Sequence, residues 1–108
     1  MLKRSERLAR ARDIEAVQRS GQTKRNAFFV VRYLIRPRSK LSRATVIVSK
    51  RVSKQAVVRN RLKRQVRALL SSPLRSQRVP MDVTVTIRSV ALGKTSRELQ
   101  KALYELFA

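Results

Sequence analysis

The chain has 108 residues, enough for one small domain with a modest hydrophobic core, which leaves no room for a second domain. Its 27 lysines and arginines face six acidic residues, so the formal net charge is +21, and a field of one sign this strong predicts a polyanionic partner. Histidine and cysteine are both absent, which excludes disulfides, zinc fingers and catalysis by a Cys–His pair. No apolar run is long enough to span a membrane, and the basic N-terminus lacks the apolar stretch of a secretory signal, so we expect a cytoplasmic protein.

The first part of the chain predicts a basic extension followed by a short helix. Residues 1–11 are basic and are expected to form a mobile N-terminal extension. A helix is predicted over residues 13–20, with Asp13 as its N-cap and Gly21 as its stop. Residues 22–26 are polar and basic, which favours a short edge strand.

Two strong strand patterns come next. Residues 28–36 (FFVVRYLIR) and residues 44–50 (ATVIVSK) are rich in β-branched or aromatic side chains, and the turn between them favours a hairpin. Alternation would place Phe28, Val30, Arg32 and Leu34 on one face of the first strand. A cation among apolar side chains suits single-stranded nucleic acid, although an arginine whose charged end reaches solvent at the sheet edge fits the pattern equally well.

The second half predicts a long helix, a strand and a final helix. The helix runs from residue 56 to about 70, with an apolar stripe at a period of 3.6, and residues 71–80 read as a loop bounded by prolines. Residues 81–88 alternate as a strand, and residues 95–107 form a helix whose Thr95 and Glu98 make a capping box. This order of elements indicates an α+β sandwich with helices packed on one sheet.

The long helix carries a cationic face opposite its apolar stripe. We give the name cationic face to six residues: Arg59, Asn60, Arg61, Lys63, Arg64 and Arg67. Like charges three or four residues apart repel by a few tenths of a kcal/mol per pair, roughly, and no acidic side chain is interspersed to relieve them. Arginine binds phosphate through two parallel hydrogen bonds, and Asn60 can contact a base edge or a ribose hydroxyl. Ser49, Lys50 and Arg51, at the end of the second strand, extend this basic surface.

Other interpretations of the same residues remain open at this point. The cationic face could be a solvated surface with no specific partner, or the chain could bind and shape DNA. A metal-dependent nuclease built on Glu6, Asp13 and Glu15 is a further alternative.

The segment Val58-Arg59-Asn60-Arg61-Leu62-Lys63-Arg64 resembles the protein subunit of bacterial ribonuclease P. The family has an Arg-Asn-Arg helix and, just upstream, a Ser-Lys strand end, which is similar to Ile47-Val48-Ser49-Lys50-Arg51. Its N-terminal pattern is matched by Arg7-Leu8, Asp13-Ile14 and Gly21, so that the resemblance covers nearly the whole chain.

The resemblance implies a single domain over residues 1–108 with the order α-β-β-β-α-β-α and a left-handed crossover, similar to the second domain of ribosomal protein S5. It implies an endoribonuclease whose large RNA subunit, using Mg²⁺, removes the 5′ leader of precursor tRNA. The protein would bind that RNA and the precursor without catalytic residues, a bound metal or a protein partner of its own.

The resemblance also assigns residues to two surfaces. The cationic face, together with Ser49, Lys50 and Arg51, would contact the catalytic RNA. A cleft formed by the first helix and the sheet would hold the single-stranded leader, and its matching positions, the leader cleft, are Ile14, Gln18, Val30 and Arg32. Aromatic residues are common in the family at three of these positions but are absent here, which predicts weaker base stacking. The rival interpretation is a non-enzymatic RNA-binding protein of the ribosomal type.

Overall fold

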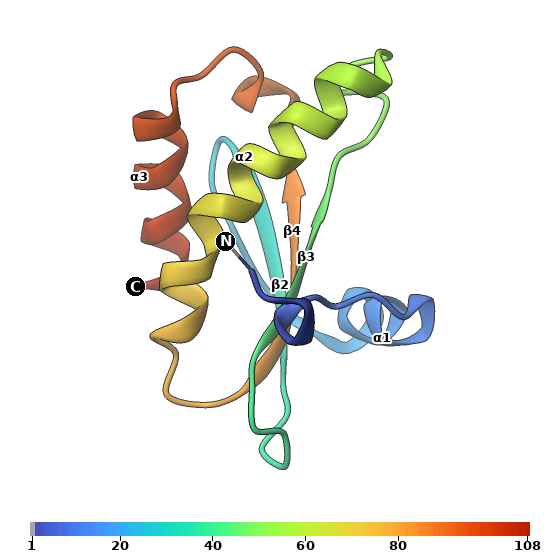
Figure 1. The fold of residues 1–108 in the computed structure, drawn as a ribbon, viewed down its shortest axis with the longest axis vertical. Helices are drawn as coiled ribbons and strands as arrows, with labels where there is room; N and C mark the ends of the chain where they lie inside the picture. Colours follow the sequence, from blue (N-terminus) through green and yellow to red (C-terminus); the bar gives the residue numbers. More distant parts are fainter. Residues whose placement is uncertain (1) are drawn as a thin grey trace.

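The computed structural model describes residues 2–108 of the chain. Three helices and one four-stranded sheet form the domain, with two short 3-10 turns (Figure 1). In chain order the elements are η1 (Arg4–Glu6), α1 (Ala11–Ser20), β1 (Gln22–Arg25), β2 (Phe29–Ile35), β3 (Arg43–Ile47), α2 (Ala56–Arg75), β4 (Met81–Ile87), η2 (Ser89–Ala91) and α3 (Ser96–Phe107). The predicted α+β class and the order of its helices and strands are confirmed.

The strand order in the sheet is β1-β2-β4-β3. β2 runs antiparallel to both of its neighbours, whereas β3 is parallel to β4 and is joined to it through α2. The predicted hairpin of β2 and β3 is therefore wrong, because β4 lies between them. β4 is the most buried strand, and a central position gives its backbone hydrogen-bond partners on both sides.

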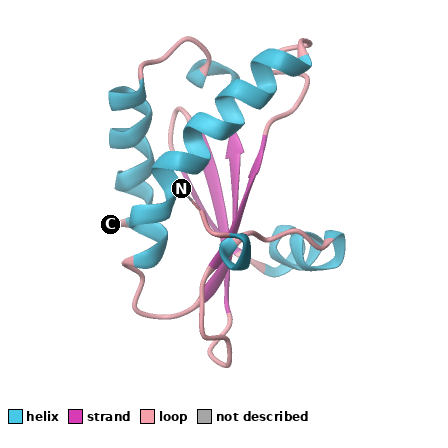
Figure 2. Ribbon diagram, in the orientation of Figure 1, coloured by secondary structure: helices cyan, strands magenta, loops and turns pink. Residues whose placement is uncertain are grey.

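The two faces of the sheet carry different layers, and Figure 2 shows the strands lying between the helices. Odd-numbered apolar residues of β2 and β4, such as Val31 and Val85, join the main core with α2 and α3. Even-numbered residues face the other way, where α1 contacts β2 and β4. This alternation follows from the two-residue repeat of a strand. The two faces of the sheet are therefore covered by different helices, α2 and α3 on one face and α1 on the other.

The first helix starts earlier than predicted. Arg10 is its N-cap and Asp13 lies inside the first turn, where its carboxylate is 3.6 Å from the Arg43 guanidinium of β3. Gly21 does end the helix, with an ordinary backbone φ of −74°. A Cβ at this position would lie 2.5 Å from the Val17 carbonyl oxygen and 2.9 Å from that of Tyr33. Glycine is thus required because the last turn of α1 and strand β2 both approach this position closely.

The long helix continues past its predicted end, through Pro73 to Arg75. The predicted loop over residues 71–80 therefore begins only at Ser76. Leu70, Pro73 and Leu74 are buried in or beside the core, and this burial outweighs the loss of one helical hydrogen bond at the proline. The hydroxyl of Ser76 and the side-chain amide of Gln77 donate to the Pro73 carbonyl and close the helix end.

The N-terminal segment differs from the predicted extension, since it packs on the domain. Leu2 and Leu8 are buried, and the Leu8 N–H donates to the Ala44 carbonyl of β3 at 2.9 Å. Glu6 accepts two hydrogen bonds from Arg75, at 2.8 and 2.9 Å. Apolar side chains at positions 2 and 8 supply the burial that anchors this basic segment; Met1 lies outside the described residues.

The last helix agrees with its prediction. Thr95 is its N-cap, and its hydroxyl oxygen accepts a hydrogen bond from the Glu98 N–H at 3.2 Å. In return the Glu98 carboxylate accepts one from the Thr95 N–H at 3.4 Å, which completes the capping box. Within residues 2–108 the helices are all too short or too polar to cross a bilayer.

Candidate nucleic-acid interface

The cationic face of α2 forms as the sequence predicts. Leu62, Val66 and Leu70 are buried beneath the helix, whereas Asn60, Arg61 and Arg64 are exposed. A shallow depression on the outer surface is lined by Val57, Asn60, Lys63, Arg64 and Arg67. The Val57 side chain, 67% exposed, adds an apolar contact beside the cations. The depression therefore offers cationic hydrogen-bond donors for phosphate, one amide and one apolar surface within about three helical turns.

Arg59 has a second task that the sequence pattern did not reveal. Its Nη1 donates to the carbonyl oxygens of Ser53 and Lys54, both at 2.9 Å. These carbonyls belong to the loop that leads into α2, so the guanidinium fixes the start of the helix. A guanidinium has five N–H donors, and the remaining ones can still serve a phosphate.

Ser49, Lys50 and Arg51 lie in a turn, because β3 ends at Ile47 and not at Lys50 as predicted. The Val52 N–H donates to the Ser49 carbonyl at 3.1 Å, and the buried Val52 side chain anchors the turn in the core. All three predicted residues are exposed in the connection that leads into α2. These three residues therefore lie just before the start of α2, the helix that carries the cationic face.

The leader cleft residues come from α1 and β2. Gln18 and Arg32 meet directly, since Arg32 Nη1 donates to Gln18 Oε1 at 2.7 Å. Ile14 and Val30, the two apolar members of this set, are half-buried on the same side of the sheet. Phe28 is not on this face as predicted: it precedes β2, and its ring packs against the main core.

Sequence reasoning missed Thr84 as part of this surface. Thr84 is the sheet partner of Arg32, is fully buried, and donates its hydroxyl to Gln18 Oε1 at 3.3 Å. Its signal in the sequence was weak, because Thr84 is one of three polar residues that alternate with apolar ones along β4, the others being Asp82 and Thr86. Only the pairing of β4 with β2 shows that this threonine lies beside Arg32.

Three of the acidic side chains, those of Glu6, Asp13 and Asp82, contact arginines on other elements of the fold. The Arg75 hydrogen bond lowers the pKa of Glu6 to about 2, with a smaller contribution from the Lys3 backbone. Asp82 of β4 accepts hydrogen bonds from Arg43 at 2.8 and 2.9 Å, yet burial raises its pKa because desolvation outweighs this pairing. Asp13 also lies near Arg43. In the described part of the chain, no three acidic side chains converge into a metal site.

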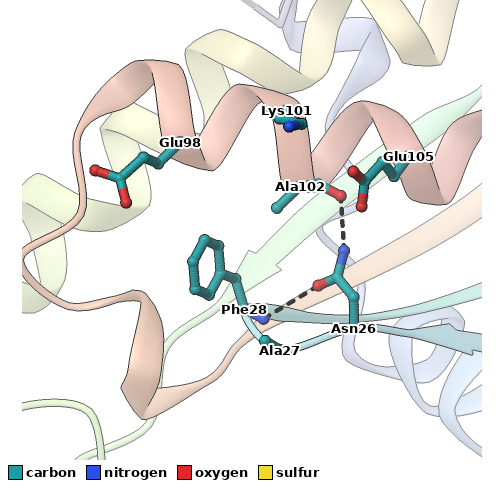
Figure 3. A pocket seen from close by; sticks show the side chains of 7 residues that line it. All are labelled: Asn26, Ala27, Phe28, Glu98, Lys101, Ala102 and Glu105. Carbon is teal, nitrogen blue, oxygen red and sulfur yellow. Dashed lines mark hydrogen bonds between the residues drawn. The ribbon is translucent and has the colours of Figure 1, made fainter.

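A separate hollow lies under α3, away from the predicted residues (Figure 3). Asn26 closes it by donating to the Ala102 carbonyl and accepting from the Phe28 N–H. Lys94 lies 5.7 Å from the centre of the Phe28 ring. The lining of the hollow combines two apolar side chains and an aromatic ring with side chains of both charges: Asn26, Ala27, Phe28, Glu98, Lys101, Ala102 and Glu105. Because two of the three charged side chains in this lining are carboxylates, the hollow is not suited to binding a polyanion.

Comparison with known proteins gives consistent results. The family model described as Ribonuclease P matches residues 2–108. The ribonuclease P protein component of Pseudanabaena sp. (strain PCC 6903) is 33% identical over 108 residues, covering 100% of this chain and 93% of the relative. That of Lactobacillus johnsonii is 35% identical, covering 91% of this chain and 84% of the relative.

Solved structures show the same fold. The ribonuclease P protein of Staphylococcus aureus superposes with a TM-score of 0.82 at 26% identity, over 94% of this chain and 91% of the other. The Thermotoga maritima protein superposes equally well, with a TM-score of 0.82 at 24% identity, and supports the fold alone. With its cationic helix, its α+β topology and this full-length match, the chain belongs to the ribonuclease P protein family.

Proposed function

We propose that this chain works as the protein component of ribonuclease P through binding, while the bond-breaking chemistry belongs to the RNA subunit. The cationic face of α2 binds the catalytic RNA, and the leader cleft residues on α1 and β2 bind the 5′ leader of precursor tRNA. The observation that supports this proposal most directly is the arrangement of α2. The helix packs its apolar side against the core and leaves Asn60, Arg61 and Arg64 of the cationic face exposed.

Electrostatics explain why such a face favours RNA. Each arginine–phosphate contact releases counterions from the RNA, so that affinity depends steeply on salt. The exposed cations of α2 repel one another in the free protein and lose that repulsion when phosphates bind. The remaining positive charge screens the repulsion between the catalytic RNA and the precursor tRNA, which raises the affinity of the holoenzyme for its substrate.

The assignment of the chemistry to RNA rests on what this chain offers. The sequence has no histidine or cysteine, and the acids Glu6, Asp13 and Asp82 are committed to arginines of the fold. We therefore propose that Mg²⁺ acts with the RNA subunit. No second protein is needed for this role, and the site of action we propose is the cytoplasm, where the RNA partners would be found.

The deciding experiment is reconstitution. The purified chain is added to a bacterial ribonuclease P RNA at low salt and moderate Mg²⁺, and leader removal from precursor tRNA is measured. We expect strong stimulation with the RNA subunit and no cleavage by the protein alone. Absence of stimulation together with tight binding to ribosomal RNA would favour the ribosomal-type alternative instead.

A double variant tests the cationic face. Arg61→Ala with Arg64→Ala should weaken binding to the RNA subunit and reduce the slope of log affinity against log salt by about 2, one for each lost phosphate contact. The matched control is Arg97→Ala with Lys101→Ala, which removes the same charge from the exposed surface of α3. If both double variants lowered affinity equally, net charge and not this face would be responsible.

A further inference from the structure

The contact between Arg32 and Gln18 fixes the orientation of the Gln18 amide. An arginine side chain has no acceptor, so the Gln18 atom that lies 2.7 Å from Arg32 Nη1 must be the carbonyl oxygen Oε1. The Thr84 hydroxyl donates to the same oxygen at 3.3 Å. Both acceptor positions of that oxygen are therefore used within the protein.

What remains available to a ligand is a set of donors. The Gln18 Nε2 group, and the Nε and Nη2 groups of Arg32, have no acceptor within hydrogen-bond distance among residues 2–108. Both side chains are half-buried and so partly open to solvent. The adjacent strand adds another cation on this face, since Arg25 pairs with Val30, two residues before Arg32 on β2.

The donors are also held in place before a ligand arrives. Thr84 is fully buried in the central strand, and its hydroxyl holds the amide that in turn orients the guanidinium. An arginine fixed in this way loses less conformational entropy when it binds than a mobile surface arginine does.

From this geometry we propose that Arg32 and Gln18 form a donor-only site that selects acceptor-only groups on the single-stranded leader. On the base edge that is read in the major groove of a duplex, only guanine presents two acceptors, O6 and N7, and a backbone phosphate presents paired acceptors as well. Adenine and cytosine place an amino donor on the corresponding edge, which would face the protein donors unpaired. The proposal rests on the proposed function, because it assumes that the leader lies in this cleft.

The test uses the reconstituted holoenzyme and precursor tRNAs whose leaders contain adenosine throughout except for one guanosine, moved from position to position. If guanine is the ligand, one position should bind about five- to a hundred-fold tighter with guanosine. Replacing that guanosine by 7-deazaguanosine, which lacks N7, should remove most of this gain. If phosphate is the ligand, all leaders should bind alike, and a methylphosphonate at one linkage should weaken binding.

Protein variants connect either result to this site. Arg32→Ala should abolish the guanosine preference or the methylphosphonate effect, and Arg32→Lys, which keeps the charge without the planar fork, should restore a phosphate effect but no guanosine preference. Gln18→Glu should reduce both effects, because its carboxylate would pair with Arg32. Arg97→Ala on α3 is the charge-matched control and should behave as the wild-type protein.

A second measurement separates this proposal from the proposed function. Affinity for the RNA subunit should be the same in the Arg32 variants and the wild-type protein, since α2 provides that grip. If Arg32→Ala bound every leader as the wild type does, while Arg61→Ala with Arg64→Ala still lost RNA affinity, the donor-only site would be refuted and the proposed function would stand.

Discussion

Arg59 lies in the cationic row of α2, yet part of its guanidinium is already bound by the protein. Its two hydrogen bonds hold the carbonyls of Ser53 and Lys54 at the entrance to the helix. We therefore expect Arg59→Ala to lower the free energy of unfolding by about 1–3 kcal/mol, as well as weakening RNA binding. Urea unfolding followed by circular dichroism measures the first effect.

The neighbouring exposed Arg61 supplies the comparison for Arg59. Arg61→Ala should reduce RNA affinity and leave the free energy of unfolding within about 0.5 kcal/mol of the wild-type value. Equal stability of the two variants would show that the Arg59 contacts to the loop carry no weight in solution.

The ion pair between Glu6 and Arg75 makes the stability of the protein depend on pH. Its pKa in the folded protein is lowered from 4.5 to about 2, chiefly by the Arg75 hydrogen bond. A carboxyl whose folded-state pKa is lowered stabilises the protein above its unfolded-state pKa, and this stability is lost as the pH falls through the folded-state pKa. The contribution of Glu6 is thus complete above about pH 4.5 and disappears towards about pH 2.

The corresponding experiment compares the wild-type protein with Glu6→Gln. The wild type should be the more stable at neutral pH, and the difference in unfolding free energy should shrink across the interval from about pH 4.5 to about pH 2. Because every other carboxyl is shared, the difference isolates Glu6. A difference that stayed constant with pH would exclude an ion pair between Glu6 and Arg75.

At the scale of secondary-structure elements, the junction of α1 and β1 depends on a missing side chain. A Cβ at Gly21 would lie too close to two backbone oxygens, those of Val17 and Tyr33. Gly21→Ala should therefore destabilise the protein by about 1–3 kcal/mol, because α1 or β2 must shift to make room. Thermal or urea unfolding measures the loss.

Gly93 gives a control with a different cause. Its φ is +82°, and a Cβ there would meet no atom within 4 Å, so the backbone conformation alone requires glycine. Asparagine tolerates this conformation better than alanine does, and Gly93→Asn should be milder than Gly93→Ala. At Gly21 asparagine should be no better than alanine, since the obstacle is steric. If Gly21→Asn were clearly milder than Gly21→Ala, the backbone conformation would be the reason for glycine at this position as well.

At the scale of the whole molecule, a chain with a net charge of +21 folds to a radius of gyration of 13.0 Å. This is the size expected for a compact domain of its length, so burial overcomes the repulsion between the cations. Multivalent anions that bind the folded surface relieve this repulsion and stabilise the native state by mass action. We expect sulfate to raise the melting temperature more than chloride at the same ionic strength, as measured by differential scanning fluorimetry. Equal melting temperatures would show that screening alone is at work.

The sequence alone determined those features that depend on local pattern. A period of 3.6 located α2 and α3, the Thr95 and Glu98 pair located a helix start, and the uninterrupted cations of α2 indicated a polyanion surface. Each of these signals lies within a few residues of the feature it predicts. The family resemblance added the proposal that this polyanion is the RNA subunit of ribonuclease P.

Only the tertiary structure decided which distant segments meet. The insertion of β4 between β2 and β3, the passage of α2 through Pro73 and the packing of Leu2 and Leu8 all result from burial in a shared core, which no local pattern specifies. The same holds for the Gln18, Arg32 and Thr84 contacts, in which three elements combine at a single oxygen atom. Local propensities are weak compared with the free energy of burying apolar surface and pairing backbone groups, so the contacts between elements follow from the whole chain.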